Sequence, residues 1–288
     1  METAVGRGQI GPRDRGVAIA CSLCGSPASF LAKHPEADLY RCCRCTHCFS
    51  HLESVEFEPY HENYFDDDHQ RWFANPNITL FTRIADAIPQ GASVLDAGCG
   101  RGDFLRHLRK IRPDLSLAGI DLAANRGGDG ITFYQGDLLS MDINGQFDAI
   151  VSLAVIEHVA DIRAFVDRLR QLTKPAGTVT VMTLNEDSLL YSLARLGKRW
   201  GIPLAFNRLY SRHHLHHFTR KSLRDVLQGG GFQIESEIVH NAPLAAIDIP
   251  VKSSAAEAVL RSGMWMVCKA GEVTGRSYLQ TIFCRRPG

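Results

Sequence analysis

The apolar and polar positions of the chain follow a pattern that predicts alternating strands and helices from about residue 89 onward. Seven short apolar runs are typical of strands, and they cover residues 93–95, 117–121, 131–137, 147–153, 178–183, 232–237 and 264–269. After the first run, Phe104, Leu105, Leu108 and Ile111 recur at helical spacing. The pattern therefore predicts an α/β fold, with a doubly wound seven-stranded sheet whose last two strands form an antiparallel hairpin.

The chain upstream of this region divides into shorter segments. Residues 53–74 are acidic and aromatic, and residues 77–88 have a helical spacing of apolar positions that ends at Pro89. We expect a helical linker or lid here, with Tyr64, Phe65 and Trp72 packing inside the protein rather than touching a ligand. The expected divisions are a disordered tail at 1–19, a small domain at 20–52, the linker at 53–90 and a large domain at 91–288.

Composition limits the classes of protein that fit. With 45% hydrophobic and 22% charged residues among 288, the chain is typical of a soluble globular protein. It has no apolar run of membrane-spanning length and no secretory signal, so the expected location is cytoplasmic. The net charge is only +1, yet residues 190–224 carry eight Lys or Arg and no acid. This distribution disfavours a uniformly basic nucleic-acid binder and allows a local surface for a phosphorylated partner.

A glycine-rich loop follows the first strand of the large domain. Asp96 ends the strand, and Gly98, Gly100 and Gly102 come next at alternate positions. Glycines let backbone N–H groups approach a ligand where a side chain would block it. Asp103 stands where the third glycine of a dinucleotide-binding loop would be, so this spacing argues against a nicotinamide cofactor.

The next strands also end in acids. Asp121 ends the second strand and Asp137 the third, while residues 147–159 contain FDAIVSL followed by AVIEHV. Together with the glycine loop, this order resembles the class I S-adenosylmethionine (SAM)-dependent methyltransferases over roughly residue 89 to the C-terminus. Residues 174–177 resemble the family's LKPGG turn, with Ala176 in place of one glycine.

The resemblance implies a Rossmann-like fold that binds SAM. Asp121 would accept hydrogen bonds from both ribose hydroxyls, Asp137 would accept from the adenine amino group, and the backbone N–H of Leu138 would face the ring. The full set of cofactor residues that it implies is Asp96, Gly98, Cys99, Gly100, Gly102, Asp121, Leu122, Asp137, Leu138 and Leu153.

Four cysteines near the N-terminus have the spacing of a structural zinc site. Cys21 and Cys24 form one pair, and Cys42 and Cys45 form a second after 17 intervening residues. Two such pairs complete a tetrahedron around zinc, and a segment this short needs the metal in order to fold. We therefore expect residues 20–52 to form a small zinc-ribbon domain. The second pair is ambiguous, because Cys45 and Cys48 have the same spacing and Cys43 is a further thiol. Redox-active dithiols and a disulfide framework are the alternatives, and the cytosolic setting argues against the latter.

The acceptor side is expected beyond the fourth and fifth strands. His158 is the candidate general base or substrate orienter, and Glu157 would orient it or join it in binding a divalent ion. Asn185 and a histidine group are candidates for contact with the acceptor, because family segments of the HxxxF type line that pocket. The histidines are His213, His214, His216 and His217. An apolar and basic insertion at 188–210 is expected to lie over the acceptor.

These observations favour transfer of a methyl group to oxygen or carbon of a small molecule, such as a sugar, a glycan or a natural-product intermediate. The basic segment would suit a phosphorylated acceptor. A ribosomal RNA base methyltransferase with a zinc ribbon is the alternative, and the lack of a basic stripe in the ribbon argues against it. A third interpretation, a zinc-ribbon binding module on an inactive scaffold, is disfavoured by the intact SAM motifs. The oligomeric state is open.

Overall fold

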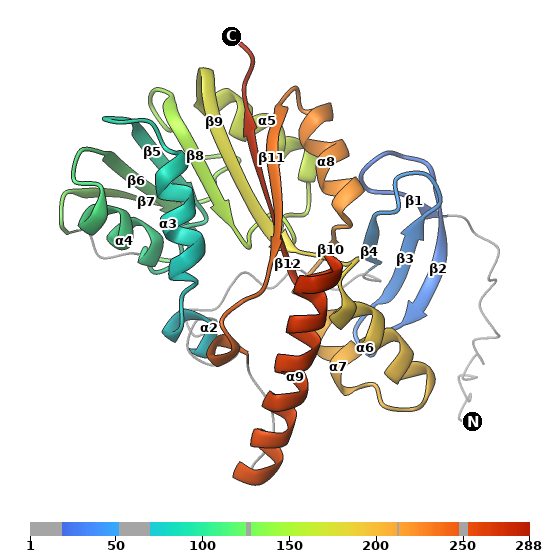
Figure 1. Ribbon diagram of the computed structural model, residues 1–288. Coiled ribbons are helices and arrows are strands. Elements are labelled where there is room, and N and C mark those ends of the chain that lie inside the picture. Colours follow the sequence, from blue (N-terminus) through green and yellow to red (C-terminus); the bar gives the residue numbers. More distant parts are fainter. Residues whose placement is uncertain (1–18, 52–69, 125–127, 212, 248–252) are drawn as a thin grey trace, which may run out of the picture.

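The computed structural model describes residues 19–51, 70–124, 128–211, 213–247 and 253–288. Two sheets organise it, one of seven strands and one of five (Figure 1). Residues 1–18 of the expected tail and 53–69 of the expected linker, with Tyr64 and Phe65, lie outside the described residues, whereas Ile19 belongs to the first strand.

The seven-stranded sheet has the order β11-β12-β9-β8-β5-β6-β7. Strand β12 runs antiparallel to both neighbours, whereas β7, β6, β5, β8 and β9 pair in parallel. The strands are β5 (Ser93–Ala97), β6 (Ser116–Asp121), β7 (Ile131–Gln135), β8 (Phe147–Leu153), β9 (Thr173–Leu184), β11 (Gln233–His240) and β12 (Leu279–Arg285). The predicted doubly wound sheet is confirmed, because this order reverses direction at β5 and β8.

The last strand was predicted at the wrong place. Residues 264–269 belong to helix α9 (Ser254–Thr274), and the strand is β12. Although Met, Trp and Val favour strands, this run lies between alanines, with an N-cap at Ser253 and a left-handed Gly275 as C-cap. The residues of β12 are buried on both faces between β9 and β11, so they lack the alternation that marks a strand in sequence.

Helices cover both faces of this sheet (Figure 1). On one face pack α3 (Ile78–Ala87) and α4 (Asp103–Ile111), and on the other α5 (Ile162–Leu172) and α8 (Arg220–Gly229). Three of them begin at a side-chain cap: Asn77 and Asp161 accept from the first turns of α3 and α5, and Thr219 forms a capping box with Ser222. Helix α4 begins instead at Gly102 of the glycine loop, which has no side chain to cap it. The predicted helix at 77–88 is confirmed as α3.

The second sheet contains the cysteine-rich segment. Its order is β1-β2-β3-β4-β10, all antiparallel. Four strands come from the N-terminal segment: β1 (Ile19–Ala20), β2 (Pro27–Lys33), β3 (Asp38–Cys42) and β4 (Cys48–His51). The fifth, β10 (His216–His217), follows β9 and pairs with β4. The N-terminal segment therefore shares a sheet with the large domain.

The remaining helices are α2 (Gln70–Ala74), α6 (Leu189–Arg199), α7 (Leu204–Leu209) and a short 3-10 turn, η1 (Leu244–Ala246). Helices α6 and α9 pack against each other on the same side of the molecule as the small sheet (Figure 1). Among the described residues, no helix is both long and apolar enough to cross a membrane.

Candidate active site

The glycine loop after β5 requires its glycines. Gly98, Gly100 and Gly102 have φ angles of 81°, 50° and 79°, a region that other residues rarely adopt. The N–H groups of Gly98 and Cys99 both donate to the carbonyl of Ile120, which fixes the loop to β6. A Cβ on Gly98 would lie 2.3 Å from Val155 Cγ2, so a larger residue would displace the segment after β8.

Asp121 holds the loop from the end of β6. Its Oδ2 accepts a hydrogen bond from Gly100 N–H at 2.8 Å, and its Oδ1 accepts from Ala123 N–H at 2.9 Å. The side chain is only partly buried, and Leu122 beside it is exposed. A carboxylate oriented in this way at a strand end can accept further hydrogen bonds from a diol.

Asp96 is the buried member of the group. Its side chain is 2% exposed, and among the described residues nothing hydrogen-bonds to its Oδ1. Burial, with the negative charges of Asp121 and Asp103, raises the pKa of Asp96 to about 8. A buried oxygen without a protein partner beside a glycine cradle fits a loop built around a polar ligand.

The third and fourth strand ends complete this edge of the sheet. Asp137 is exposed, and its Oδ1 accepts from Leu139 N–H at 2.9 Å, while Leu138 is buried. Leu153 ends β8 partly buried, and Ala154 after it has a φ of 57°, an unfavourable backbone angle of the kind found at functional sites. The polar groups near the carboxyl ends of β5, β6 and β7, including the carboxylates of Asp96, Asp121 and Asp137, thus lie along the same edge of the sheet as the end of β8.

Helix α2 reaches the same loop from outside the sheet. The guanidinium of Arg101 lies 5.6 Å from the centre of the Phe73 ring. Trp72 packs against the apolar cluster beneath α3 and α4, in agreement with its expected packing role. The described end of the linker therefore lies beside the glycine loop.

His158 and Glu157 have different surroundings. The Nδ1 of His158 lies 2.6 Å from the carbonyl oxygen of His213, and its ring is 4.9 Å from that of His214. Because a carbonyl can only accept, Nδ1 carries the proton and Nε2 is the acceptor nitrogen. Glu157 is fully buried and accepts from Thr183 Oγ1 at 2.8 Å, and burial raises its pKa to about 7.

The structure separates the four histidines of the second group. His213 and His214 are partly buried and approach His158, as described above. His216 and His217 lie inside the contact between the two sheets: His216 Nδ1 is 3.1 Å from His47 Nε2, and His217 Nε2 is 3.3 Å from Ser50 Oγ. Burial lowers the pKa of both rings, so they are neutral.

Asn185 is occupied within the fold. Its amide donates to the Ser277 carbonyl at 2.9 Å, and its Oδ1 accepts from Asp187 N–H at 3.1 Å. The side chain thus ties the end of β9 to the start of β12. This position explains its complete burial and gives no contact that points to an acceptor.

The cysteine cluster has the geometry of a four-thiolate site. The sulfurs of Cys21, Cys24, Cys42 and Cys45 lie within 4.8 Å of one another, with Cys21–Cys45 at 3.7 Å and Cys24–Cys42 at 3.5 Å. Zinc–sulfur bonds of about 2.3 Å in a tetrahedron place sulfurs about 3.8 Å apart, so the donor set fits zinc.

The two cysteine turns are built alike. Cys21 N–H donates to Ser26 O and Cys42 N–H donates to His47 O, with left-handed residues at Gly25 and Thr46. Of the two ambiguous thiols, Cys43 is exposed and Cys48 points its sulfur toward Thr46 O, 3.8 Å away; neither belongs to the cluster.

Comparison with known proteins now identifies the family. A family model described as "Methyltransferase domain" matches residues 68–237. The chain belongs to the methyltransferase-domain family. An uncharacterized methyltransferase of Mycobacterium tuberculosis is 32% identical over 135 residues, which cover 44% of this chain and 68% of the relative.

Other relatives match a shorter part. A ubiquinone biosynthesis O-methyltransferase of a Bradyrhizobium species is 29% identical over 118 residues, 38% of this chain and 47% of the relative. The chain thus spans about half the length of the first such relatives.

Solved structures agree on the fold. Burkholderia thailandensis 1,6-didemethyltoxoflavin-N1-methyltransferase, solved with S-adenosylhomocysteine, is 14% identical with a TM-score of 0.53, covering 85% of this chain and 98% of that one. Haemonchus contortus phosphoethanolamine N-methyltransferase 2, solved with SAM, is 15% identical with a TM-score of 0.54, covering 84% and 62%. At these identities the likeness is one of fold, and the fold is that of class I methyltransferases.

A buried ionic group joins the N-terminal segment to the methyltransferase domain, and sequence analysis missed it. Both oxygens of Glu186, directly after β9, lie 2.7 Å from Arg41 Nη2 of β3. Arg195 of α6 also pairs with Glu186, and Tyr210 donates its hydroxyl to it at 2.7 Å. The sequence offered one indication, which is that Glu186 lies just before the acid-free stretch 190–224. Nothing in the sequence indicated that Glu186 would pair with Arg41.

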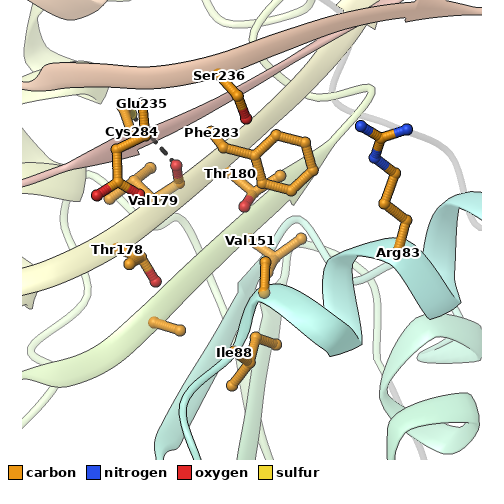
Figure 2. A pocket seen from close by; sticks show the side chains of 12 residues that line it. Arg83, Ile88, Val151, Thr178, Val179, Thr180, Glu235, Ser236, Phe283 and Cys284 are labelled. Atoms are coloured by element: carbon orange, nitrogen blue, oxygen red, sulfur yellow. Dashed lines mark hydrogen bonds between the residues drawn. The ribbon is translucent and has the colours of Figure 1, made fainter.

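The methyltransferase domain also has a hollow of about 160 Å³, away from the strand ends (Figure 2). It lies on the sheet face beside α3, where Ile88, Val151 and Phe283 line it and Arg83 stands at one side. Its lining comes from the middle of β8 and β9 and from β11 and β12, and it includes no residue of the glycine loop and not His158.

Proposed function

We propose that this protein is a SAM-dependent methyltransferase that acts on oxygen or carbon of a small molecule. The observation that carries the proposal is the glycine cradle whose Gly100 N–H is held by the carboxylate of Asp121. The buried Oδ1 of Asp96, which has no hydrogen-bond partner within the described part of the chain, lies at the same edge and adds a polar group to the cradle. The relatives named ubiquinone biosynthesis O-methyltransferases support a small-molecule acceptor.

The chain's own residues would bind the cofactor as follows. Asp121 accepts hydrogen bonds from the ribose hydroxyls, Asp137 and the N–H of Leu138 bind the adenine, and the loop from Gly98 to Gly102 faces the methionine part. When bound, SAM supplies an electrophilic methyl group. Transfer is an in-line displacement, so the protein mainly has to hold the acceptor atom in line and exclude water.

His158 is the base in this proposal. A hydroxyl or carbon acid must lose a proton as it attacks, and Nε2 of His158 is the nitrogen that can accept it. The carbonyl of His213 holds the ring from the other side, which fixes both the tautomer and the orientation. Glu157 acts differently: its carboxyl is bonded to Thr183 inside the fold and supports the segment that carries His158.

The acceptor is proposed to be a sugar, glycan or natural-product intermediate, and the basic segment at 190–224 would suit a phosphorylated one. We further infer one structural zinc on Cys21, Cys24, Cys42 and Cys45. Four thiolates leave no open coordination position, so the metal stabilises the small sheet and takes no part in transfer.

The proposal is tested first by SAM binding. Calorimetry should show one site per chain, and Asp121→Ala should weaken SAM binding by about 1–3 kcal/mol, because the ribose contacts and the clamp on Gly100 are both lost. Asp142→Ala is the matched control, since Asp142 is an exposed acid that is not among the proposed site residues. Equal affinity in the Asp121 variant and the wild type would refute this cofactor site.

The acceptor class is tested by transfer of labelled methyl from SAM. Nucleotide sugars, phenolic acids and cell extracts should include an acceptor that takes up the label. Uptake only by RNA, with binding that falls steeply as salt rises, would instead support the RNA methyltransferase alternative. SAM binding without transfer to any fraction would favour the inactive scaffold.

A further inference from the structure

The turn between α6 and α7 carries an unusual group of exposed apolar side chains. Trp200 is 74% exposed, Ile202 64% and Leu204 54%. Leu193 and Leu196 are also exposed and lie on the same face of α6 as Trp200, because the three are spaced at i, i+3 and i+7. We call this surface the apolar tip, and its residues are Leu193, Leu196, Trp200, Ile202 and Leu204.

The apolar tip is an ordered structure. Trp200 N–H donates to Leu196 O at 3.2 Å, and Ile202 N–H donates to Gly197 O at 2.9 Å. Gly201 has a φ of 83°, which a residue with a side chain would rarely adopt, and Pro203 leads into α7. The hydrogen-bonded turn therefore holds the side chains of Trp200 and Ile202 in an exposed position.

Positive charge adjoins the apolar tip. Lys198 and Arg199 directly precede Trp200, and Arg208 is exposed on α7. Four other cations of residues 190–224 are paired with acids and do not add to this charge: Arg195, Arg220, Lys221 and Arg224. Lys198 is held in place, since its ammonium bonds to the Lys33 carbonyl and lies 3.9 Å from the centre of the Phe206 ring. Arg199 is exposed. Apolar and aromatic side chains beside cations suit a surface with both an apolar layer and negative charge.

We propose that the apolar tip docks this protein on the surface of a lipid bilayer that contains anionic lipids. Trp200 and Ile202 would enter the boundary between headgroups and acyl chains, while the exposed Arg199 would contact the phosphates. Self-association through the same surface is the competing outcome, and sedimentation of the protein without lipid distinguishes it.

The test is flotation of the full-length protein with vesicles of phosphatidylcholine and phosphatidylglycerol, at roughly three to one. The wild type should bind them and bind pure phosphatidylcholine much less. Trp200→Ser/Ile202→Ser should weaken binding at least about tenfold, since two large apolar side chains no longer enter the bilayer. Arg199→Glu should weaken binding to anionic vesicles roughly tenfold and leave binding to neutral ones unchanged.

Matched control variants distinguish docking through the apolar tip from nonspecific adsorption to lipid. Ile78→Ser/Ile111→Ser removes two exposed isoleucines from α3 and α4, and Lys110→Glu reverses an exposed charge on α4. Both should bind vesicles as the wild type does, and far-UV circular dichroism should show that every variant is folded. The proposal is overturned if the wild type does not bind, or if the tip variants bind equally well. It is also overturned if sedimentation without lipid shows a dimer that Trp200→Ser/Ile202→Ser dissociates.

Discussion

At the scale of single residues, environment gives the same side chain different chemistry. Asp96 and Asp121 end neighbouring strands, yet Asp121 holds two backbone N–H groups while Asp96 is buried with a raised pKa. His158 and His216 lie close to the same strand end, but His158 is held by a carbonyl at the sheet edge and His216 lies between the two sheets. The residue type identifies a candidate site residue in the sequence, and its burial and hydrogen-bond partners in the fold determine its chemical role.

The base role of His158 is tested by substitution. His158→Ala should leave SAM affinity nearly unchanged and lower turnover by roughly 10²–10⁴-fold, because the proton of the acceptor would have no base. His51→Ala is the control, since His51 is an exposed histidine that is not among the proposed site residues. Turnover that His158→Ala leaves intact would show that the ring is structural.

Glu157 gives a prediction for stability against pH. Burial raises its pKa to about 7, from about 4.3 in an unfolded chain, so the folded state holds its proton more tightly. Its contribution to stability is therefore complete at low pH and is lost as pH rises from about 4.3 to 7. Glu157→Gln should be more stable than the wild type at pH 8, by about 1–3 kcal/mol, and should lose this advantage near pH 5.

The Glu157 comparison is made by denaturant unfolding of the two proteins at both pH values. The amide keeps an oxygen that can accept from Thr183, so the substitution changes the charge more than the packing. An identical difference between variant and wild type at pH 5 and pH 8 would show that Glu157 does not titrate in this range.

At the scale of elements, local signals located most of the sheet. The Asp-glycine loop, the acids at strand ends and the helical spacing at 77–88 are short-range features, and each has its expected element in the structure. The exception is β12. A strand buried on both faces shows no alternation of apolar and polar residues, so the sequence does not mark it as a strand. The apolar run at 264–269 was mistaken for this strand, although Ser253 and Gly275 cap the helix that contains it.

The cysteine turns yield a prediction at this scale. Purified protein should contain one zinc per chain, and Cys21→Ser/Cys42→Ser should lose it, because two of four thiolates are removed. Cys43→Ser/Cys48→Ser is the matched control and should keep full zinc, since both sulfurs lie outside the cluster. Metal analysis decides between them, and zinc retained in the first variant would rule out these ligands.

At the scale of the whole molecule, the two sheets form a continuous structure. Strand β10 of the methyltransferase domain completes the small sheet, and the buried carboxylate of Glu186 pairs with the partly buried Arg41 of that sheet. Removing the cations would leave the buried charge of Glu186 uncompensated, which costs more than an exposed pair is worth. The small sheet is therefore part of the support for the segment that carries the histidines.

This continuity predicts how metal removal acts on the molecule. A strong zinc chelator should lower the melting temperature of the whole chain and raise hydrogen exchange in β10 and α6 as well as in β2 and β3. Loss of protection confined to residues 19–51 would contradict the coupling. Glu186→Gln should weaken the same coupling, since Arg41 and Arg195 would lose their common partner.

The sequence by itself determined the features that depend on neighbours within a few residues. These are the first five strands of the large sheet, the glycine loop, the strand-end acids and the spacing of the cysteine pairs. Only the tertiary structure decided that the last strand is β12, that His216 and His217 form a strand of the small sheet, that Glu186 meets Arg41, and that Asn185 is used inside the fold. Those contacts join residues from about 90 to 170 positions apart, and their energy comes from desolvation and pairing that exist only once the chain is packed.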